Sequence, residues 1–314
     1  MWRTDGFLLL PENREWRTEN CFMDWMSRRI TAILENALME DRATRDATSY
    51  ACIDPNQQAV GTILAKQDCV LSGIGCVQRI FEVFAALDGT VRSHPEVVTH
   101  TEIFDGVRLR PGLTVAVVRH NARVMLSCER VILNVLQRMS GIATLTRQYV
   151  EAVQGTKCTI LDTRKTVPGL RVLDKYAVRC GGGKNHRLDL SDGVLIKNNH
   201  IHLCGGIKNA LHRAHQNRRG EQVIEVEVRS LAELEEALQN GAEAILLDNM
   251  TPEQVGACVE RVQSHSRRVP LEASGGMNLE TVRAYAETGV DYISIGALTH
   301  SPKAADMSMR IMPA

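Results

Sequence analysis

The chain has 314 residues, enough for two compact domains, and its hydrophobic fraction of 44% and charged fraction of 24% are typical of a globular protein. Its 37 lysines and arginines balance 37 aspartates and glutamates, so the zero net charge argues against a general nucleic-acid-binding surface. No stretch approaches the roughly 20 apolar residues of a membrane-spanning helix. The nine cysteines form no Cys-x-x-Cys pair, so we expect reduced thiols in a soluble, cytoplasmic protein.

The first part of the chain mixes helical and strand-like patterns. Residues 1–25 lack sustained periodicity and are expected to form an N-terminal extension, with Asp24 capping the first helix. Residues 26–140 contain short strand-like runs separated by Asp-Gly and Pro-Gly turns, which predicts an α+β domain. We expect strands at 60–64, 69–72, 97–100 and 113–118, and helices at 76–87 and 125–154. The C-terminal segment 298–314 is expected to pack on this domain.

A regular alternation of apolar strands and capped helices begins near residue 157. Repeated βα units of this kind indicate a parallel sheet or barrel. The segment 141–297 is short for a full eight-fold barrel, which typically takes about 250 residues, so we predict an incomplete, TIM-like α/β barrel. The expected strands are 159–161, 194–196, 223–228, 244–247, 270–273 and 292–295.

The helices of this alternation carry recognisable end signals. Ser230 with Glu233 matches a capping box, and so does the run 251–254, in which proline occupies the first helical position. Gly241 and Gly289 stand where a helix needs a left-handed residue after its C-terminal end. These signals fix where the strands between the helices begin and end.

Polar or small residues follow every predicted barrel strand. In βα barrels the active site lies at the C-terminal ends of the strands, so these residues are expected to converge on one pocket. Ordinary polar surface loops explain one or two such cases, but they explain the full set poorly. The strand-end residues are 162–165, 197–200, Glu227, 248–249, 274–276 and Gly296.

Two glutamates alternate with aliphatic residues in the predicted strand 223–228. This spacing puts Glu225 and Glu227 on one side of the strand and the aliphatic residues on the other. If the aliphatic side meets the helices, the glutamates point into the barrel, where carboxylates need an ionic partner or a metal. The alternative is an edge strand whose glutamates face water.

The remaining strand ends favour a polyanionic ligand. The run 274–276 and Gly296 end the last two strands, where barrels commonly bind phosphate with backbone N–H groups. A concentration of cations lies between the first two strands, beside a triple glycine at 181–183 that is expected to hold a rigid loop. Cations opposite carboxylates predict a pocket for a polyanionic substrate and a divalent metal. The cations are Arg164, Lys165, Arg171, Lys175, Arg179, Lys184, His186, Arg187 and Lys197.

These residues occur in long motifs that resemble one family. The runs Asp-Thr-Arg-Lys-Thr-Val-Pro-Gly-Leu-Arg at 162–171 and Gly-Gly-Gly-Lys-Asn-His-Arg at 181–187 are its most specific features. Leu-Ile-Lys-Asn-Asn-His at 195–200, Glu-Val-Glu-Val at 225–228 and Glu-Ala-Ser-Gly-Gly at 272–276 continue the match in order. Over roughly residues 26–300 the chain resembles nicotinate-nucleotide pyrophosphorylases (carboxylating), also called quinolinate phosphoribosyltransferases (decarboxylating).

The resemblance implies a fold, a reaction and an assembly. It implies an N-terminal α+β domain and an incomplete α/β barrel, in dimers or hexamers whose active sites are completed by the partner subunit. The implied reaction transfers the phosphoribosyl group of phosphoribosyl pyrophosphate to quinolinate with decarboxylation, giving nicotinate mononucleotide, pyrophosphate and CO₂ for NAD biosynthesis. The implied cofactor is Mg²⁺.

The resemblance also implies roles for individual residues. The quinolinate carboxylates are assigned to Arg164, His186, Arg187 and Lys197, with Arg130 supplied by the neighbouring chain. Phosphoribosyl pyrophosphate is assigned to Lys165, Lys197, Glu227, Asp248, Ser274, Gly275, Gly276 and Gly296. Glu227 and Asp248 are expected to bind Mg²⁺ directly or through water, and with Lys165 they form the expected catalytic set.

Three other functions fit the same residues. A related phosphoribosyltransferase could use a different acceptor, such as nicotinate. A Schiff-base aldolase would use Lys165 or Lys197 as the nucleophile. A non-catalytic anion-binding protein would bind ligand without forming product. Supplying quinolinate and nicotinate side by side identifies the acceptor. Borohydride trapping with a keto-substrate tests for an aldolase.

Overall fold

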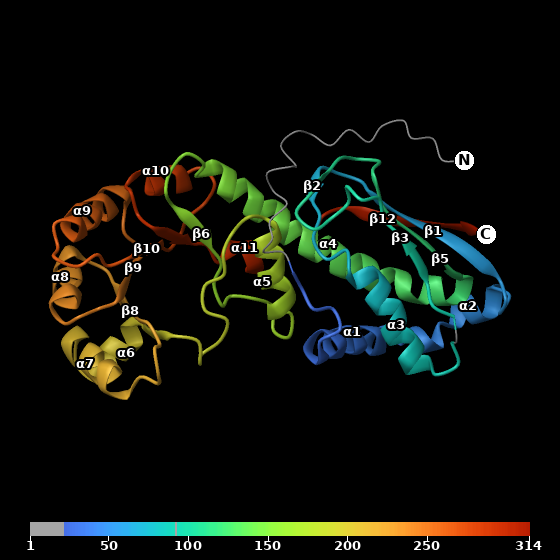
Figure 1. Ribbon diagram of the computed structural model, residues 1–314, viewed down its shortest axis with the longest axis horizontal. Coiled ribbons are helices and arrows are strands. Elements are labelled where there is room, and N and C mark those ends of the chain that lie inside the picture. The colour runs from blue at the N-terminus through green and yellow to red at the C-terminus, as the bar shows by residue number, and fades with distance from the viewer. Residues whose placement is uncertain (1–21, 92) are drawn as a thin grey trace. The chain divides into compact units, whose positions relative to one another are not determined.

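The computed structural model describes residues 22–91 and 93–314, which form two compact units (Figure 1). The first unit comprises the described residues up to Leu145 together with 167–182 and 302–314, and the second comprises 146–166 and 183–301. Most of the expected extension, residues 1–21, lies outside the described residues. No described helix is long and apolar enough to cross a membrane.

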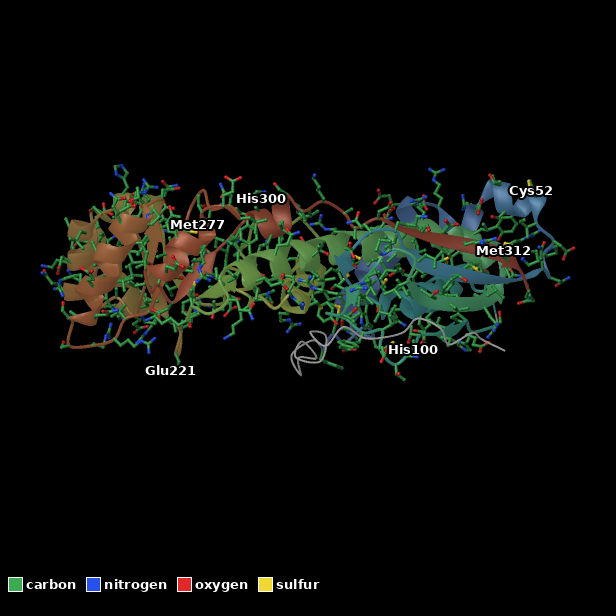
Figure 2. The ribbon with its side chains drawn as sticks, turned by 90° about the horizontal axis from the view of Figure 1, so that it is seen from above. Cys52, His100, Glu221, Met277, His300 and Met312 are labelled. Atoms are coloured by element: carbon green, nitrogen blue, oxygen red, sulfur yellow. The ribbon has the colours of Figure 1, made fainter. Side chains whose placement is uncertain are left out.

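The first unit contains a four-stranded sheet in the order β12-β1-β5-β3, and every pair in it is antiparallel. Its C-terminal strand pairs with β1 over seven residues, from Ala59 opposite Pro313 to Ala65 opposite Met307, and Met312 near its end is exposed (Figure 2). The last residues of the chain therefore return to the unit built from its beginning. The strands are β1 (Gln58–Ala65), β3 (Glu96–Val98), β5 (Thr114–Asn121) and β12 (Met307–Pro313), with a separate pair β2 (Cys69–Val70) and β4 (Arg108–Leu109).

Helices accompany these strands. Ile30, Leu34 and Leu38 on α1 are buried, and α1 packs on α3. The helix α1 begins at Arg28 with Ser27 at its N-cap, so the expectation that Asp24 caps it is wrong: Asp24 accepts the Met26 N–H in a turn before the helix. The elements are α1 (Arg28–Glu40), η2 (Ala43–Arg45), α2 (Ala47–Cys52), α3 (Cys76–Asp88), α4 (Ala122–Ala152) and α5 (Arg171–Cys180).

Helix α5 belongs to the first unit, although it was expected within the barrel segment. Its Asp174 is fully buried and accepts two hydrogen bonds, at 2.9 and 2.7 Å, from the Arg138 guanidinium of α4. Its Tyr176 hydroxyl donates to the buried Asp105 carboxylate at 2.6 Å. Buried charged groups are stable only with such partners, so these contacts bind α5 to the first unit.

The second unit is built on a six-stranded sheet in the order β6-β11-β10-β9-β8-β7, and every pair in it is parallel. Among the described residues this sheet ends at β6 and β7, which confirms the incomplete barrel. The outer side of β6 is bridged only by Lys184, opposite Leu161. The strands are β6 (Thr159–Leu161), β7 (Val194–Ile196), β8 (Ile224–Val228), β9 (Ala244–Asp248), β10 (Leu271–Ser274) and β11 (Tyr292–Ser294).

Helices cover the outside of this sheet (Figure 1). Thr251 and Gln254 form the expected capping box, whereas Ser230 accepts the Glu233 N–H but the Glu233 carboxylate accepts the Arg229 N–H instead of completing a box. Gly241 and Gly289 adopt φ values of 82° and 86°, as expected. The helices are α6 (Asn198–Cys204), α7 (Ile207–Asn217), α8 (Leu231–Gln239), α9 (Pro252–Gln263), α10 (Val282–Glu287) and α11 (Ala297–His300).

Strand β8 has the alternation that its sequence predicts. Ile224, Val226 and Val228 are fully buried, and β8 packs against α7 and α8. The glutamates consequently point to the other side of the sheet. Because β8 pairs with both β7 and β9, the edge-strand alternative is wrong.

Candidate functional site

One pocket in the second unit collects residues from the ends of all six barrel strands. Its volume is about 450 Å³. The convergence of strand ends that the sequence predicts is therefore confirmed. The pocket is lined by Thr163, Arg164, Lys165, His186, Arg187, Leu195, Lys197, Glu227, Leu246, Asp248, Asn249, Glu272, Ser274, Gly275, Gly276 and Ser294.

Four cationic side chains line this pocket: Arg164 and Lys165 after β6, Arg187 in the following loop, and Lys197 after β7. Burial lowers the pKa of Arg187, and the like charge of the neighbouring Arg164 guanidinium lowers it further. The Nε of Arg164 is buried and has no hydrogen-bond partner among the described residues. A buried, unpaired guanidinium N–H is costly, so an anionic ligand that accepts it is expected to bind here.

The backbone of Lys165 is held from two sides. Its N–H donates to the Thr163 hydroxyl at 3.0 Å, and its carbonyl accepts the Thr299 hydroxyl at 2.9 Å. Gly296 lies beside its side chain, because a Cβ added there would be 2.8 Å from Cδ of Lys165. Gly296 does not itself line the pocket, but it leaves room for a lysine that does.

The acids Glu227 and Asp248 lie at the ends of the neighbouring strands β8 and β9. Glu227 is 8% exposed, and its Oε2 lies 3.9 Å from Nζ of Lys197. Arg229, which sequence reasoning missed, pairs with Glu227 at 3.7 Å and with Asp248 at 3.2 Å. The signal was available in the sequence, because Arg229 follows Glu227 by two residues and period-2 alternation puts both on the same side of the strand.

Backbone conformation shapes the β10 end of the pocket. Gly275 has φ of +107°, and a Cβ added there would overlap the side chain of Asn249, which itself has φ of +55°. The Ser294 hydroxyl donates a hydrogen bond to the Ser274 hydroxyl at 3.0 Å. This end of the pocket therefore offers hydroxyls and closely approachable backbone, which suit a phosphate group.

Replacing Gly275 with alanine is expected to destabilise the protein by about 2–4 kcal/mol, because the strained φ and the overlap with Asn249 add together. Gly155→Ala is a matched control: Gly155 has φ of +83°, but an added Cβ there meets no atom within 4 Å. The control is expected to cost about 1–2 kcal/mol. Denaturant unfolding measures both, and equal costs would contradict crowding at Gly275.

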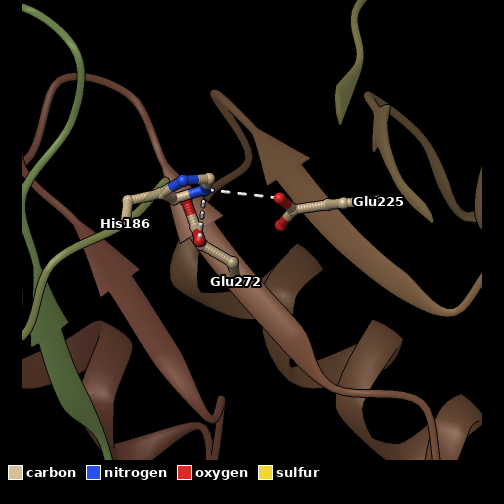
Figure 3. A group of neighbouring side chains, drawn as sticks. All are labelled: His186, Glu225 and Glu272. Carbon is tan, nitrogen blue, oxygen red and sulfur yellow. Dashed lines mark ion pairs between the residues drawn. The ribbon is translucent and has the colours of Figure 1, made fainter. Parts of the chain in front are cut away.

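A second group of charged side chains lies on one wall of the pocket. The His186 Nε2 is 3.3 Å from Oε2 of Glu225 on β8 and 3.3 Å from Oε2 of Glu272 on β10 (Figure 3). Burial by itself would lower the pKa of His186, but the hydrogen bonds and charges of both glutamates raise it to about 10. The sequence predicted that Glu225 points into the barrel but gave it no partner. Glu272 appeared in the motif at 272–276, but no role at the site was predicted for it.

The loop that carries His186 is anchored by a buried acid at the end of β6. Asp162 is fully buried, accepts the backbone N–H of His186 at 2.8 Å and accepts the Asn185 side-chain amide at 2.7 Å. These bonds fix the loop close to the end of β6. Asp162 is therefore a structural residue of the site.

Arg130, like Gly296, is an expected site residue that does not line this pocket. It lies on α4 in the first unit and is exposed, whereas every pocket residue belongs to the second unit. The family resemblance implies that Arg130 enters the active site of a partner subunit. That assignment stays a prediction.

Comparisons with known proteins agree with the motifs. Residues 46–140 match the family described as quinolinate phosphoribosyl transferase, N-terminal domain, and residues 142–310 match its C-terminal domain. The probable nicotinate-nucleotide pyrophosphorylase (carboxylating) of Bacillus subtilis is 41% identical over 90% of this chain and 93% of its own length. The nicotinate-nucleotide pyrophosphorylase (carboxylating) of Mycobacterium leprae is 42% identical over 88% of this chain and 95% of its own.

Solved structures give the same result. The crystal structure of NadC from Streptococcus pyogenes matches with a TM-score of 0.85 and 37% identity, covering 93% of this chain and 99% of that one. Sequence and structural similarity thus extend over both units. The chain belongs to the quinolinate phosphoribosyltransferase family.

Proposed function

We propose that this chain transfers the phosphoribosyl group of phosphoribosyl pyrophosphate to quinolinate, releasing pyrophosphate and CO₂ and forming nicotinate mononucleotide. The observation that carries the proposal is the pocket itself, in which four lysine and arginine side chains, three acids and a glycine-rich strand end converge. A dianionic aromatic acid and a phosphorylated sugar together need that combination of charges.

The cations are assigned to the acceptor. Arg164, Arg187 and Lys197 bind the two carboxylates of quinolinate, and His186 lies on the same wall with its ring nitrogens engaged by the Arg187 N–H and the two glutamates. The unpartnered Nε of Arg164 supports this assignment, because a planar guanidinium pairs with a carboxylate through two parallel hydrogen bonds. Such pairs orient the ring so that its nitrogen faces the anomeric carbon of the donor.

The donor is assigned to the other end of the pocket. Ser274, Gly275 and Gly276, with Gly296 nearby, bind the 5′-phosphate, and the positive φ of Gly275 and Gly276 supports close approach of their backbone. Lys165 and Lys197 lie between the acceptor and the pyrophosphate of the donor. This arrangement places the two lysine side chains between the carboxylates of the acceptor and the pyrophosphate of the donor, where the negative charge of the two substrates is greatest.

Glu227 and Asp248 fit a Mg²⁺ site. They end adjacent strands, line the same pocket and supply carboxylate oxygens, and Mg²⁺ is commonly bound by one or two carboxylates together with substrate phosphates. Their ion pairs with Arg229 support a cation at this position. Glu227 and Asp248 would hold Mg²⁺ there, and the ion would supply positive charge to neutralise the pyrophosphate.

The residues of this chain then account for the chemistry. As the bond from the anomeric carbon to pyrophosphate breaks, positive charge develops on the ribose, and the carboxylates of Glu227 and Asp248 stabilise it. The pyridine nitrogen attacks that carbon and becomes quaternary. It then stabilises the electron pair left on the adjacent ring carbon when its carboxylate departs as CO₂, a step that Lys165 assists with its positive charge. That carbon takes up a proton from solvent to give nicotinate mononucleotide.

We also propose a cytoplasmic homodimer or hexamer with shared active sites, in which Arg130 enters the pocket of a partner subunit.

Mixing inactive Arg130→Ala and Lys165→Ala proteins is expected to restore about one quarter of wild-type activity, since half of randomly formed dimers are mixed and each holds one intact site. Subunit exchange followed by product assay measures this. Recovery no greater than the sum of the two variants would contradict a shared site.

Incubation with quinolinate, phosphoribosyl pyrophosphate and Mg²⁺ tests the proposal directly. Nicotinate mononucleotide and CO₂ are expected in equal amounts. Supplying nicotinate in place of quinolinate is the matched comparison. If the protein turned over nicotinate but not quinolinate, nicotinate would be the acceptor. Trapping of a keto-substrate on Lys165 or Lys197 by borohydride would indicate an aldolase.

A further inference from the structure

The contacts of His186 define the state of its ring. Its Nδ1 is 2.7 Å from the backbone nitrogen of Arg187, whose N–H donates to it. A nitrogen that accepts an N–H presents a lone pair and cannot itself carry a proton. The two glutamates raise the pKa of His186 and so favour a second proton on its ring, but the 2.7 Å contact leaves no room for that proton on Nδ1, and the contact decides the state. The proton of the imidazole is therefore on Nε2, which faces Glu225 and Glu272 (Figure 3).

The same contact argues against a metal ion in this group. The three ligand atoms lie within 4.8 Å of one another, and the His186–glutamate separations of 3.3 Å are those of ligands around a tetrahedral ion. However, a metal would take the Nε2 lone pair and leave the proton on Nδ1, directly opposite the Arg187 N–H. With the proton on Nε2, both ring nitrogens have a hydrogen-bond partner. With a metal on Nε2, the proton on Nδ1 would face the Arg187 N–H and neither would have an acceptor.

Burial adds to the case for a shared proton. The side chains of His186, Glu225 and Glu272 are 14%, 13% and 5% exposed, so two full negative charges this close would repel strongly. Burial raises the pKa of Glu272, and the Glu225 carboxylate raises it further while His186 opposes the shift. The buried Oε1 of Glu272 has no hydrogen-bond partner among the described residues.

The ring in turn holds part of the ligand-binding wall. Asp162 fixes the backbone N–H of His186, and the ring of His186 fixes the backbone N–H of Arg187. We propose that Glu225 and Glu272 are positioning residues that hold His186 in the Nε2–H tautomer and so keep Arg187 in place for the acceptor carboxylate. The identity of that acceptor rests on the proposed function, but the tautomer does not.

Nitrogen NMR of protein carrying ¹⁵N-histidine tests the tautomer without any assay of activity. The His186 signal, assigned by its loss in His186→Gln, is expected to show a protonated Nε2 and an unprotonated Nδ1. Glu272→Gln keeps an acceptor oxygen and is expected to keep this pattern, whereas Glu272→Leu is expected to lose it. Glu225→Leu is the second variant, because Glu225 is less buried and its replacement is less disruptive.

Kinetics supply the matching functional measurement. The KM for quinolinate is expected to rise about tenfold in Glu272→Leu and to stay within about threefold in Glu272→Gln, while the KM for phosphoribosyl pyrophosphate stays unchanged in both. A protonated Nδ1 in the wild-type protein, stoichiometric zinc lost in His186→Gln, or unaltered quinolinate KM in both leucine variants would each overturn the inference. Wild-type protein that does not turn over quinolinate, but shows the expected tautomer, would overturn the proposed acceptor instead.

Discussion

Replacing Arg164 with alanine is expected to lower kcat/KM for quinolinate by about 10²- to 10⁴-fold. The guanidinium lines the pocket, and its Nε has no hydrogen-bond partner among the described residues, so the charge of Arg164 is available to an anionic ligand. Loss of a bidentate, charge-assisted pair removes both affinity and the orientation of the pyridine nitrogen. Steady-state kinetics with each substrate varied in turn measure the effect.

Donor binding distinguishes a specific loss of quinolinate binding from general damage to the pocket. Binding of phosphoribosyl pyrophosphate at the Ser274 end is expected to persist in Arg164→Ala, which calorimetry can measure. Arg164→Lys keeps the charge but not the planar fork, so it is expected to recover only part of the lost activity. Arg213→Ala, which removes an exposed arginine of α7, is the control. Near wild-type kinetics in Arg164→Ala would refute the assignment.

The barrel could be predicted from the sequence because its signals are local. Strands β6 and β7 have the predicted bounds, 159–161 and 194–196, and the other four differ from prediction by one residue at one or both ends. Each apolar run lies between a left-handed glycine or a turn and a capped helix, so chain-local chemistry sets its limits. Once the strands are parallel, their C-terminal ends must converge, and the pocket follows.

What could not be predicted depends on contacts between distant residues. The pairing of His186 with Glu272 joins positions 86 residues apart, and nothing in either local pattern indicates it. The placement of α5 in the first unit likewise rests on the pairing of Asp174 with Arg138. The β4 strand was missed because it has only two residues, too few for a period to be recognised.

Replacing Asp248 with asparagine is expected to lower kcat by about 10²- to 10³-fold and to raise the Mg²⁺ concentration that gives half-maximal activity. Asp248 ends β9 beside Glu227, and both carboxylates contact Arg229, so the negative charge at this position is shared between two acids. Removing one leaves Arg229 in excess and makes the position less attractive to a second cation.

A double variant separates the loss of the Asp248 carboxylate from the excess positive charge of Arg229. Asparagine preserves the shape of Asp248, and the double variant Asp248→Asn with Arg229→Gln removes the excess positive charge as well. It is expected to recover part of the Mg²⁺ affinity but little of kcat, because the carboxylate that stabilises charge on the ribose is still missing. Glu280→Gln changes an exposed acid of the same unit and serves as the control for net charge. If Asp248→Asn showed the wild-type Mg²⁺ dependence, Asp248 would not be a ligand, and a wild-type kcat would remove it from the catalytic set.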